Sequence, residues 1–331
     1  MGKQKYVDRF HSLTFINTLI GSVLSKNDFR LFSEAKTIEG AIESIAHKPL
    51  GEYLSTILRV KGGYYSSLVN SLDEYLRTVL NNIIGLAIPL YREDVYVVEN
   101  LYDTVNIIQL YTAYLQKTKP QILFPGGTLY LKGFLVDNID LREALRLSGL
   151  LRLFENEMIV EKLSISKILQ KLLSILKLRE GNVRSSKTRN MYRMIYDYLV
   201  LKTSYSLGYE FLAEGTISGF GFGYDALESF ARERSFDSLY NLLRARYMDW
   251  GEIYRELNEL INSIVALDYA HILFLARASA NMLMPYSSEL YLRAILLIRA
   301  ENVFTKLALG FLFNQYDMRL FQSLINRWWF Y

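Results

Sequence analysis

Long stretches of this chain place apolar residues at the spacing of one helical face, and this pattern limits the possible fold more than any other feature. That spacing, three or four positions between apolar residues, is typical of amphipathic helices. No stretch alternates apolar and polar residues with period two for long, so strands are not expected. The chain is predicted to be all-α. The clearest case is the stretch 66–84, with Leu68, Val69, Leu72, Leu76, Val79, Leu80 and Ile83 on one face.

Turn residues divide the helical pattern into separate elements. Ser25-Lys26-Asn27-Asp28 is expected to break the first helix, and Pro49 to end the element before it. The charged segment 179–190 is interpreted as the most flexible link in the chain. Helices are predicted over 10–25, 38–45 (opened by Thr37), 53–60, 66–84, 95–117, 141–154, 159–178, 191–207, 225–247, 250–275 and beyond, 289–313 and 318–329.

A short polar pattern recurs along these helices and indicates an internal repeat. In the stretch 101–111, an apolar helix has Asp103 and Asn106 three positions apart, and Gly127-Thr128-Leu129 follows. A second copy has Asp197, at an offset of 94 (197 − 103), and then Gly215-Thr216-Ile217, at an offset of 88 (215 − 127). Glu301-Asn302 forms a third, more divergent copy.

The recurrence predicts three helical modules, with approximate boundaries 1–100, 101–190 and 191–331. Modules of this size bury their apolar faces poorly alone, so neighbouring modules should pack on one another. The polar residues have two interpretations: a polar site on one helix face, or buried hydrogen-bonding posts that fix the register between helices. We favour posts, because buried amides and carboxylates must find partners. The predicted posts are Asn17, Asp103, Asn106, Asp197, Glu301 and Asn302.

Charge and residue usage argue against several classes of function. The formal net charge is +4 from 38 basic and 34 acidic residues, whereas nucleic-acid binders usually have a basic stripe. The densest basic stretch, 177–193, is interpreted as a solvated loop. Cysteine is absent and three histidines lie far apart, so no metal site is expected. The histidines are His11, His47 and His271.

Glycine-rich segments suggest phosphate binding, but their context does not fit. Gly219-Phe220-Gly221-Phe222-Gly223 lacks a following Gly-Lys-Ser/Thr, and no strand is expected before it. It is therefore interpreted as a flexible turn, as is Pro125-Gly126-Gly127. No Ser/His/acid set is arranged locally, although a triad assembled by the fold stays open. No catalytic residue, cofactor or small-molecule substrate is predicted.

Two features bear on location and on partners. The longest apolar run, 83–91, is about half of the roughly 20 residues needed to span a bilayer. With a charged N-terminal segment, this predicts a soluble intracellular protein that can still be peripheral to a membrane complex. The terminal Trp328-Trp329-Phe330-Tyr331 either caps the core or docks on a partner, and the core is favoured.

Taken together, these motifs resemble the C-type rotor component of the archaeal A-type ATP synthases and the related d-type component of vacuolar-type ATPases. The resemblance runs over nearly the whole chain. It is found in the stretch 102–106 with 125–129, in Asp197 with 214–217, and in Arg299-Ala300-Glu301-Asn302-Val303 with Leu309-Gly310. Val200 stands where the middle copy would have its amide. The architecture and role are therefore transferred, but no partner-binding residues.

The resemblance implies three similar modules around a pseudo-threefold axis, forming a funnel. A protein of this family sits on the cytoplasmic face of the membrane proteolipid ring and receives the end of the central stalk. It is a non-catalytic rotor part that couples proton or sodium flow to ATP synthesis or hydrolysis. The expected partners are the proteins of the ring and of the central stalk. A helical-repeat scaffold that binds other proteins is the alternative function, and an enzyme would require a pocket with converging polar groups.

Overall fold

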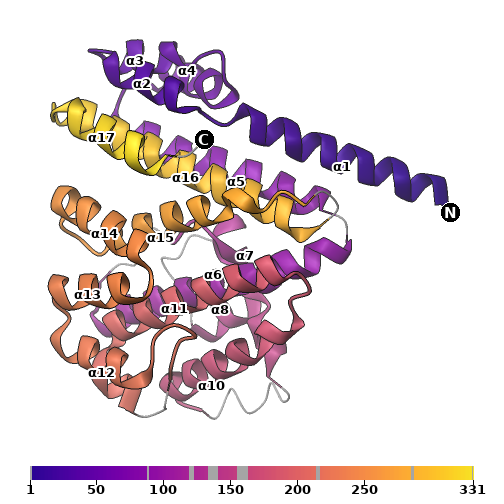
Figure 1. The fold of residues 1–331 in the computed structure, drawn as a ribbon, viewed down its shortest axis with the longest axis vertical. Helices are drawn as coiled ribbons and strands as arrows, with labels where there is room; N and C mark the ends of the chain where they lie inside the picture. The colour runs from indigo at the N-terminus through magenta and orange to yellow at the C-terminus, as the bar shows by residue number, and fades with distance from the viewer. Residues whose placement is uncertain are drawn as a thin grey trace. The chain divides into compact units, whose positions relative to one another are not determined.

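A computed structural model describes residues 2–87, 89–118, 123–132, 141–154, 163–213, 217–284, 287–329 and 331, without the side chains of 2–10, 89, 90 and 141. The regular structure within these residues is helical throughout, which confirms the all-α prediction (Figure 1). Within the same residues, no helix is both long enough and apolar enough to cross a bilayer. Glu214-Gly215-Thr216, Pro285 and Phe330 lie outside the described residues.

The described helices follow one another through short connections. The α-helices are α1 (Gly2–Ser22), α2 (Lys26–Glu34), α3 (Ile38–Ser44), α4 (Pro49–Lys61), α5 (Tyr65–Leu86), α6 (Pro89–Leu115), α7 (Gly127–Leu131), α8 (Leu141–Ser148), α10 (Ile165–Leu178), α11 (Ser186–Ala213), α12 (Tyr224–Glu233), α13 (Phe236–Arg246), α14 (Met248–Ile261), α15 (Val265–Ala278), α16 (Ser288–Phe313) and α17 (Met318–Trp328). The 3₁₀ helices are η2 (Leu150–Leu153), η3 (Arg179–Asn182) and η4 (Ser279–Asn281).

Contacts within the chain define two compact units. Unit 1 combines residues 1–89 with 253–331, and unit 2 is residues 90–252. The three consecutive modules predicted above therefore do not coincide with the two units, because the N-terminal and C-terminal segments pack together. The modules at 1–100, 101–190 and 191–331, and their pseudo-threefold arrangement, stay predictions.

Unit 1 is built around α16, which packs against α5 and α15. Nearly every side chain of α16 is buried, as expected for a helix that is apolar all round. The predicted amphipathic helix 66–84 is confirmed as α5, with its apolar face buried. An aromatic cluster closes the other side of α16, with ring centroids 5.3–6.4 Å apart: Phe29, Phe304, Phe321 and Trp329.

Unit 2 has α6 and α11 as its long helices, and aromatic rings link them. The Phe124 ring stacks on Tyr102 of α6 at 4.7 Å and lies 5.4 Å from Tyr198 of α11. Tyr198 in turn contacts the buried Trp250 at 6.3 Å. The segment that follows α6 is thereby built into the core between two helices.

Several helix boundaries differ from the sequence prediction for local reasons. Ser25-Lys26-Asn27-Asp28 ends the first helix but also starts a helix that was not predicted, because Ser25 and Asp28 form a capping box for α2. Pro49 begins α4 instead of ending an element, since proline is tolerated in the first helical turn. The predicted helix 225–247 is two helices, and α14 and α15 replace the single helix from 250. At these breaks Arg234 and Asn262 adopt left-handed backbone angles, each with φ 47°.

The charged segment 179–190 is not a long loop, and this prediction was wrong. Residues 179–182 form η3, and α11 begins at Ser186, so 183–185 alone separate the two elements. Glu180 accepts a hydrogen bond of 2.8 Å from Arg193, and Arg189 donates to the Val183 carbonyl at 2.8 Å. These bonds between charged side chains and the backbone hold a segment whose composition resembles that of a flexible link. The basic stretch 177–193 is accordingly helical for most of its length.

The terminal aromatic residues belong to the core of unit 1. Trp328 is 5 % exposed and Trp329 is 1 % exposed. The Trp328 indole donates to Glu256 at 2.6 Å, and the Trp329 indole donates to the Leu24 carbonyl at 3.0 Å. Of the two interpretations given above, burial in the core holds for both tryptophans.

Candidate functional site

Asp103 and Asn106 of α6 are fully buried and bind the segment that follows the helix. The Asp103 carboxylate accepts the N–H of Leu129 at 2.8 Å. The Asn106 amide donates to the carbonyls of Phe124 and Gly126 at 3.3 and 2.8 Å. The two side chains therefore fix a turn against α6, whereas the sequence predicted posts that set the register between helices.

Glu99, one helical turn before Asp103, completes this set and was missed in the sequence. Its carboxylate accepts the N–H of Gly127 at 2.7 Å. Gly127 and Leu129 lie in the first turn of α7, whose N–H groups have no partner within that helix. Glu99 and Asp103 thus cap α7 from a neighbouring helix. The four-residue spacing from Asp103 was the available signal, since it places Glu99 on the same helix face.

Asp197 of α11 does for a second turn what Asp103 does for the first. It is fully buried and accepts the N–H groups of Phe220 and Gly221, the shortest contacts being 2.5 and 2.9 Å. The Tyr247 hydroxyl donates to the same carboxylate at 2.6 Å. The glycine-rich stretch does bind an anion, but that anion is the protein's own Asp197. It is an anchored turn, not the flexible turn predicted from its composition.

Glycine is required in both turns because the backbone lies against the carboxylate. A Cβ atom on Gly127 would lie 2.6 Å from Asp103 Oδ1, and Gly127 has φ +80°. A Cβ atom on Gly219 would lie 2.3 Å from Asp197 Oδ1, and one on Gly221 2.7 Å from Oδ2. By its hydrogen bonds, the counterpart of 127–129 is therefore 219–221, at an offset of 92 (219 − 127). This replaces the sequence match to 215–217.

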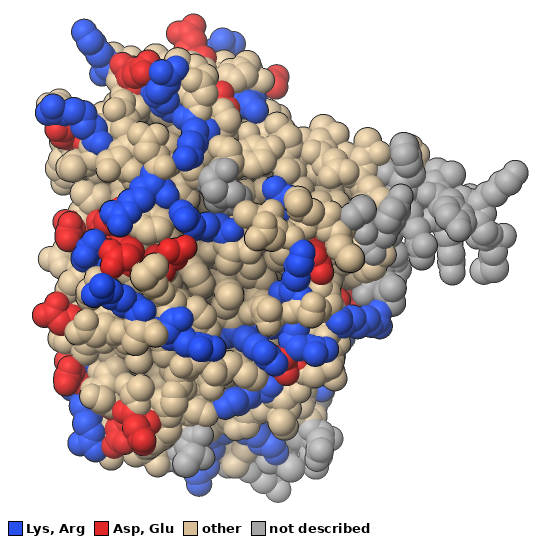
Figure 2. Space-filling model, viewed as in Figure 1, with Lys and Arg blue, Asp and Glu red and all other residues tan. Residues whose placement is uncertain are grey.

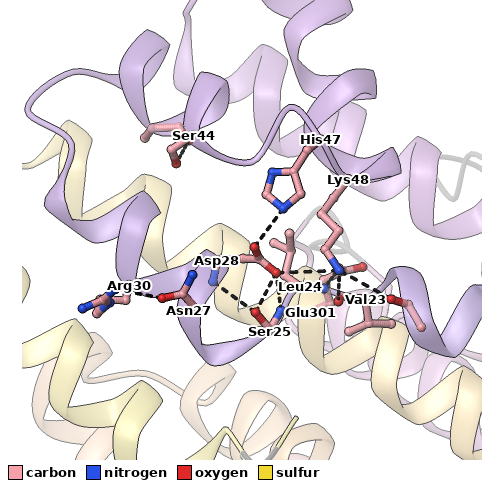
Figure 3. A network of polar contacts seen from close by, with 12 residues as sticks. Val23, Leu24, Ser25, Asn27, Asp28, Arg30, Ser44, His47, Lys48 and Glu301 are labelled. Carbon is pink, nitrogen blue, oxygen red and sulfur yellow. Dashed lines mark hydrogen bonds and ion pairs between the residues drawn. The ribbon is translucent and has the colours of Figure 1, made fainter.

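Glu301 and Asn302 of α16 form the corresponding set in unit 1 (Figure 3). Glu301 accepts the N–H of Leu24 at 2.7 Å, and the turn at 23–25 leads directly into α2. Asn302 donates to the Leu72 carbonyl of α5 at 3.0 Å. Here the bound turn comes from the opposite end of the chain, which is why no downstream glycine segment matched in the sequence.

We call these three segments carboxylate-anchored turns: 126–129, 219–221 and 23–25. In each, a buried carboxylate on a long helix accepts backbone N–H groups of a turn, and a shorter helix starts at or soon after that turn. A buried backbone N–H without a partner costs about 1–3 kcal/mol, so each carboxylate stabilises the path of the chain at that point.

Asn17 does not belong to this set, and its prediction as a post was wrong. Its side chain is exposed on α1, while the adjacent Ile16 is fully buried. Successive residues of a helix are about 100° apart, so the face that buries Ile16 turns Asn17 outward.

Burial raises the pKa of all three anchoring carboxyl groups. The pKa of Asp103 rises to about 7, chiefly through desolvation, with a smaller contribution from the Glu99 charge and opposition from the backbone N–H groups. Desolvation also raises the pKa of Glu301 to about 7 and raises that of Asp197. These groups bind protons more readily than exposed carboxyl groups.

A serine, an aspartate and a histidine do meet near α2 (Figure 3), but not in the order of a catalytic triad. Asp28 lies between the other two: it accepts from the Ser25 hydroxyl at 2.8 Å and lies 3.0 Å from His47 Nε2. A triad needs the histidine next to the serine, where it can take the hydroxyl proton. Burial raises the pKa of Asp28, but the Ser25 hydrogen bonds and the Lys48 and His47 charges outweigh it, so the pKa is lowered. The cluster caps α2.

The other potential sites offer little that is organised for chemistry. His11 is exposed and His271 is buried on α15. Within the described residues, no three His, Cys, Asp or Glu side chains are grouped as metal ligands would be. Unit 2 has two adjoining surface hollows of about 370 and 440 Å³ that share Arg179 and Asn182, and neither is lined by an anchoring carboxylate.

Comparison with known proteins adds no assignment to this geometry. Neither a scan against models of protein families nor a search of curated proteins found a match to this chain.

Proposed function

We propose that this chain is a non-catalytic rotor subunit of an A-type or V-type ATP synthase. In that role it couples the membrane proteolipid ring to the rotating central stalk. It sits on the cytoplasmic face of the membrane and is held there by its protein partners. The proposal starts from the sequence resemblance given above.

The recurring carboxylate-anchored turn is the structural observation that supports this proposal most. The resemblance implies three similar modules, and the same bonding scheme is found on α6, α11 and α16. A repeated tertiary bond of this kind is expected of repeated modules, because each module solves the same problem of capping a buried turn.

The scheme also suits the mechanical task proposed. A part that transmits torque must resist local deformation, and turns are usually the least stable part of a helical protein. Buried charge-assisted hydrogen bonds from Asp103, Asp197 and Glu301 restrain the turns. This argument supports rigidity and not a particular partner.

Co-purification tests the proposal. An affinity-tagged copy is expressed in the native cells, membranes are solubilised in mild detergent, and retained proteins are identified by mass spectrometry. The expected result is enrichment of proteolipid and central-stalk proteins together, with ATPase activity in the eluate. Cells with the untagged copy provide the background.

A chain that elutes as a monomer, without ring or stalk proteins, would contradict the proposal. Retention of proteins unrelated to any ATPase would instead favour the helical scaffold. The Gly127→Ala variant, which disturbs the turn at 126–129, shows whether association depends on an intact anchored turn.

A further inference from the structure

Basic side chains gather on one face of unit 2, around the turn at 219–221. Figure 2 shows Lys and Arg spread across the surface over α10, α11 and α13. Contacts place three of them next to the turn: Lys177 of α10, Arg193 of α11 and Arg246 of α13. We call these three residues and Phe220 the basic face.

Phe220 lies at the centre of this face between two cations. Lys177 Nζ and the Arg193 guanidinium carbon each lie 5.7 Å from the centre of its ring. The ring also packs edge-on against Tyr196 at 5.3 Å and remains partly exposed. Cation–π contacts at this distance favour the charged side chains staying over the ring.

The backbone below the ring is held rigidly. Asp197 accepts the N–H groups of Phe220 and Gly221, and Lys177 donates to the Ser218 carbonyl and hydroxyl at 3.0 and 2.7 Å. A surface already held in one conformation loses little entropy when a partner binds. Arginine and aromatic residues in such positions are also the types that dominate binding energy at interfaces.

The charges on this face are only partly neutralised. Glu180 forms ion pairs with Arg193 at 2.7 Å and with Arg189 at 3.8 Å. Arg246 packs against Gly221 and lies near Tyr247, which itself binds Asp197. Arg193 is 46 % exposed, and Arg246 is also exposed, so a partner can reach both guanidinium groups.

An acidic protein segment fits this face better than nucleic acid or a membrane. The cluster is compact and contains Glu180, whereas a nucleic-acid backbone needs an extended basic stripe. Phe220 packs between Lys177, Arg193 and Tyr196, so it does not project as a membrane-inserting residue does. Acidic side chains can pair with the cations while their methylene groups lie on the Phe220 ring.

We propose that the basic face, Lys177, Arg193, Phe220 and Arg246, docks an acidic segment of a partner protein. Charge complementarity sets the orientation and speeds the encounter, and the ring supplies an apolar contact at the centre. The inference does not depend on the rotor function, because any partner with such a segment would satisfy it.

Binding of poly-L-glutamate, an acidic polypeptide probe, tests the proposal with the full-length chain at physiological ionic strength. The expected result is saturable binding that weakens at least tenfold in Lys177→Glu/Arg193→Glu and several-fold in Phe220→Ala. The control variant Arg30→Glu/Arg319→Glu makes the same charge change at exposed residues of unit 1 and should bind as the wild type does. Circular dichroism verifies that every variant is folded.

Three outcomes would overturn the proposal. The first is no saturable binding of polyglutamate. The second is equal weakening in the control variant, which would show a response to net charge alone. The third is tighter binding of duplex RNA or of phosphatidylserine vesicles than of polyglutamate, because the face would then serve a different class of partner.

Discussion

Replacing Asp103 by asparagine should change how the stability of the protein depends on pH. The folded-state pKa of Asp103 is about 7, against an ordinary value of 3.8. The folded state therefore holds a proton at Asp103 over a range in which the unfolded state has lost it. The stabilisation from this group is fully present below the unfolded pKa and is lost as pH rises through about 7.

The size of the effect follows from the shift. Roughly three pKa units correspond to about 4 kcal/mol in total, at about 1.4 kcal/mol per unit. Between pH 8 and pH 5 this group alone should raise the free energy of unfolding by about 2.5 kcal/mol. Asparagine keeps an oxygen for the Leu129 N–H but does not titrate, so Asp103→Asn resembles the protonated form at every pH.

Urea unfolding followed by circular dichroism between pH 5 and pH 8 measures this effect. Glu301 titrates in the same direction, so the informative quantity is the difference between wild type and Asp103→Asn at each pH. That difference should change by about 2.5 kcal/mol, with the wild type gaining stability relative to the variant as pH falls. The exposed Asp225→Asn variant provides a control whose difference stays constant. A constant difference for Asp103→Asn, or one of opposite sign, would refute the reasoning.

Three further substitutions test the anchored turns and the core. Gly127→Ala should lower the free energy of unfolding by about 2 kcal/mol or more, since its φ of +80° and the nearby Asp103 leave no room for a Cβ; a urea midpoint equal to wild type would contradict this. Tyr247→Phe removes a donor to Asp197 and should raise the pKa of that carboxyl further, as measured by carbon NMR of ¹³C-labelled aspartate; a lowered pKa would exclude the proposed role of the hydroxyl. Trp329→Ala should destabilise unit 1 by about 3–5 kcal/mol in thermal unfolding, because the indole fills the cluster around Phe304 and binds the Leu24 carbonyl; a change below about 1 kcal/mol would show that the indole is dispensable.

Local features of the sequence were sufficient for the helical class and for many elements. The spacing of apolar residues located α5 and α16, because a buried helical face has the same period in any fold. Thr37 marked the start of α3, since its side chain caps that helix directly. The sequence also singled out Asp103, Asp197 and Glu301, because a charged residue within an apolar helix is unusual.

What those carboxylates bind was decided by tertiary structure alone. Asp103 and Asp197 reach turns 23–26 positions downstream, while Glu301 binds Leu24, 277 positions before it. Residue types cannot indicate such partners, because any backbone N–H can donate and only the path of the chain brings one within reach. The same reason explains why Asn17 was wrongly included, why Glu99 was missed, and why the glycine-rich stretch at 219–223 looked like a free loop although it encloses Asp197.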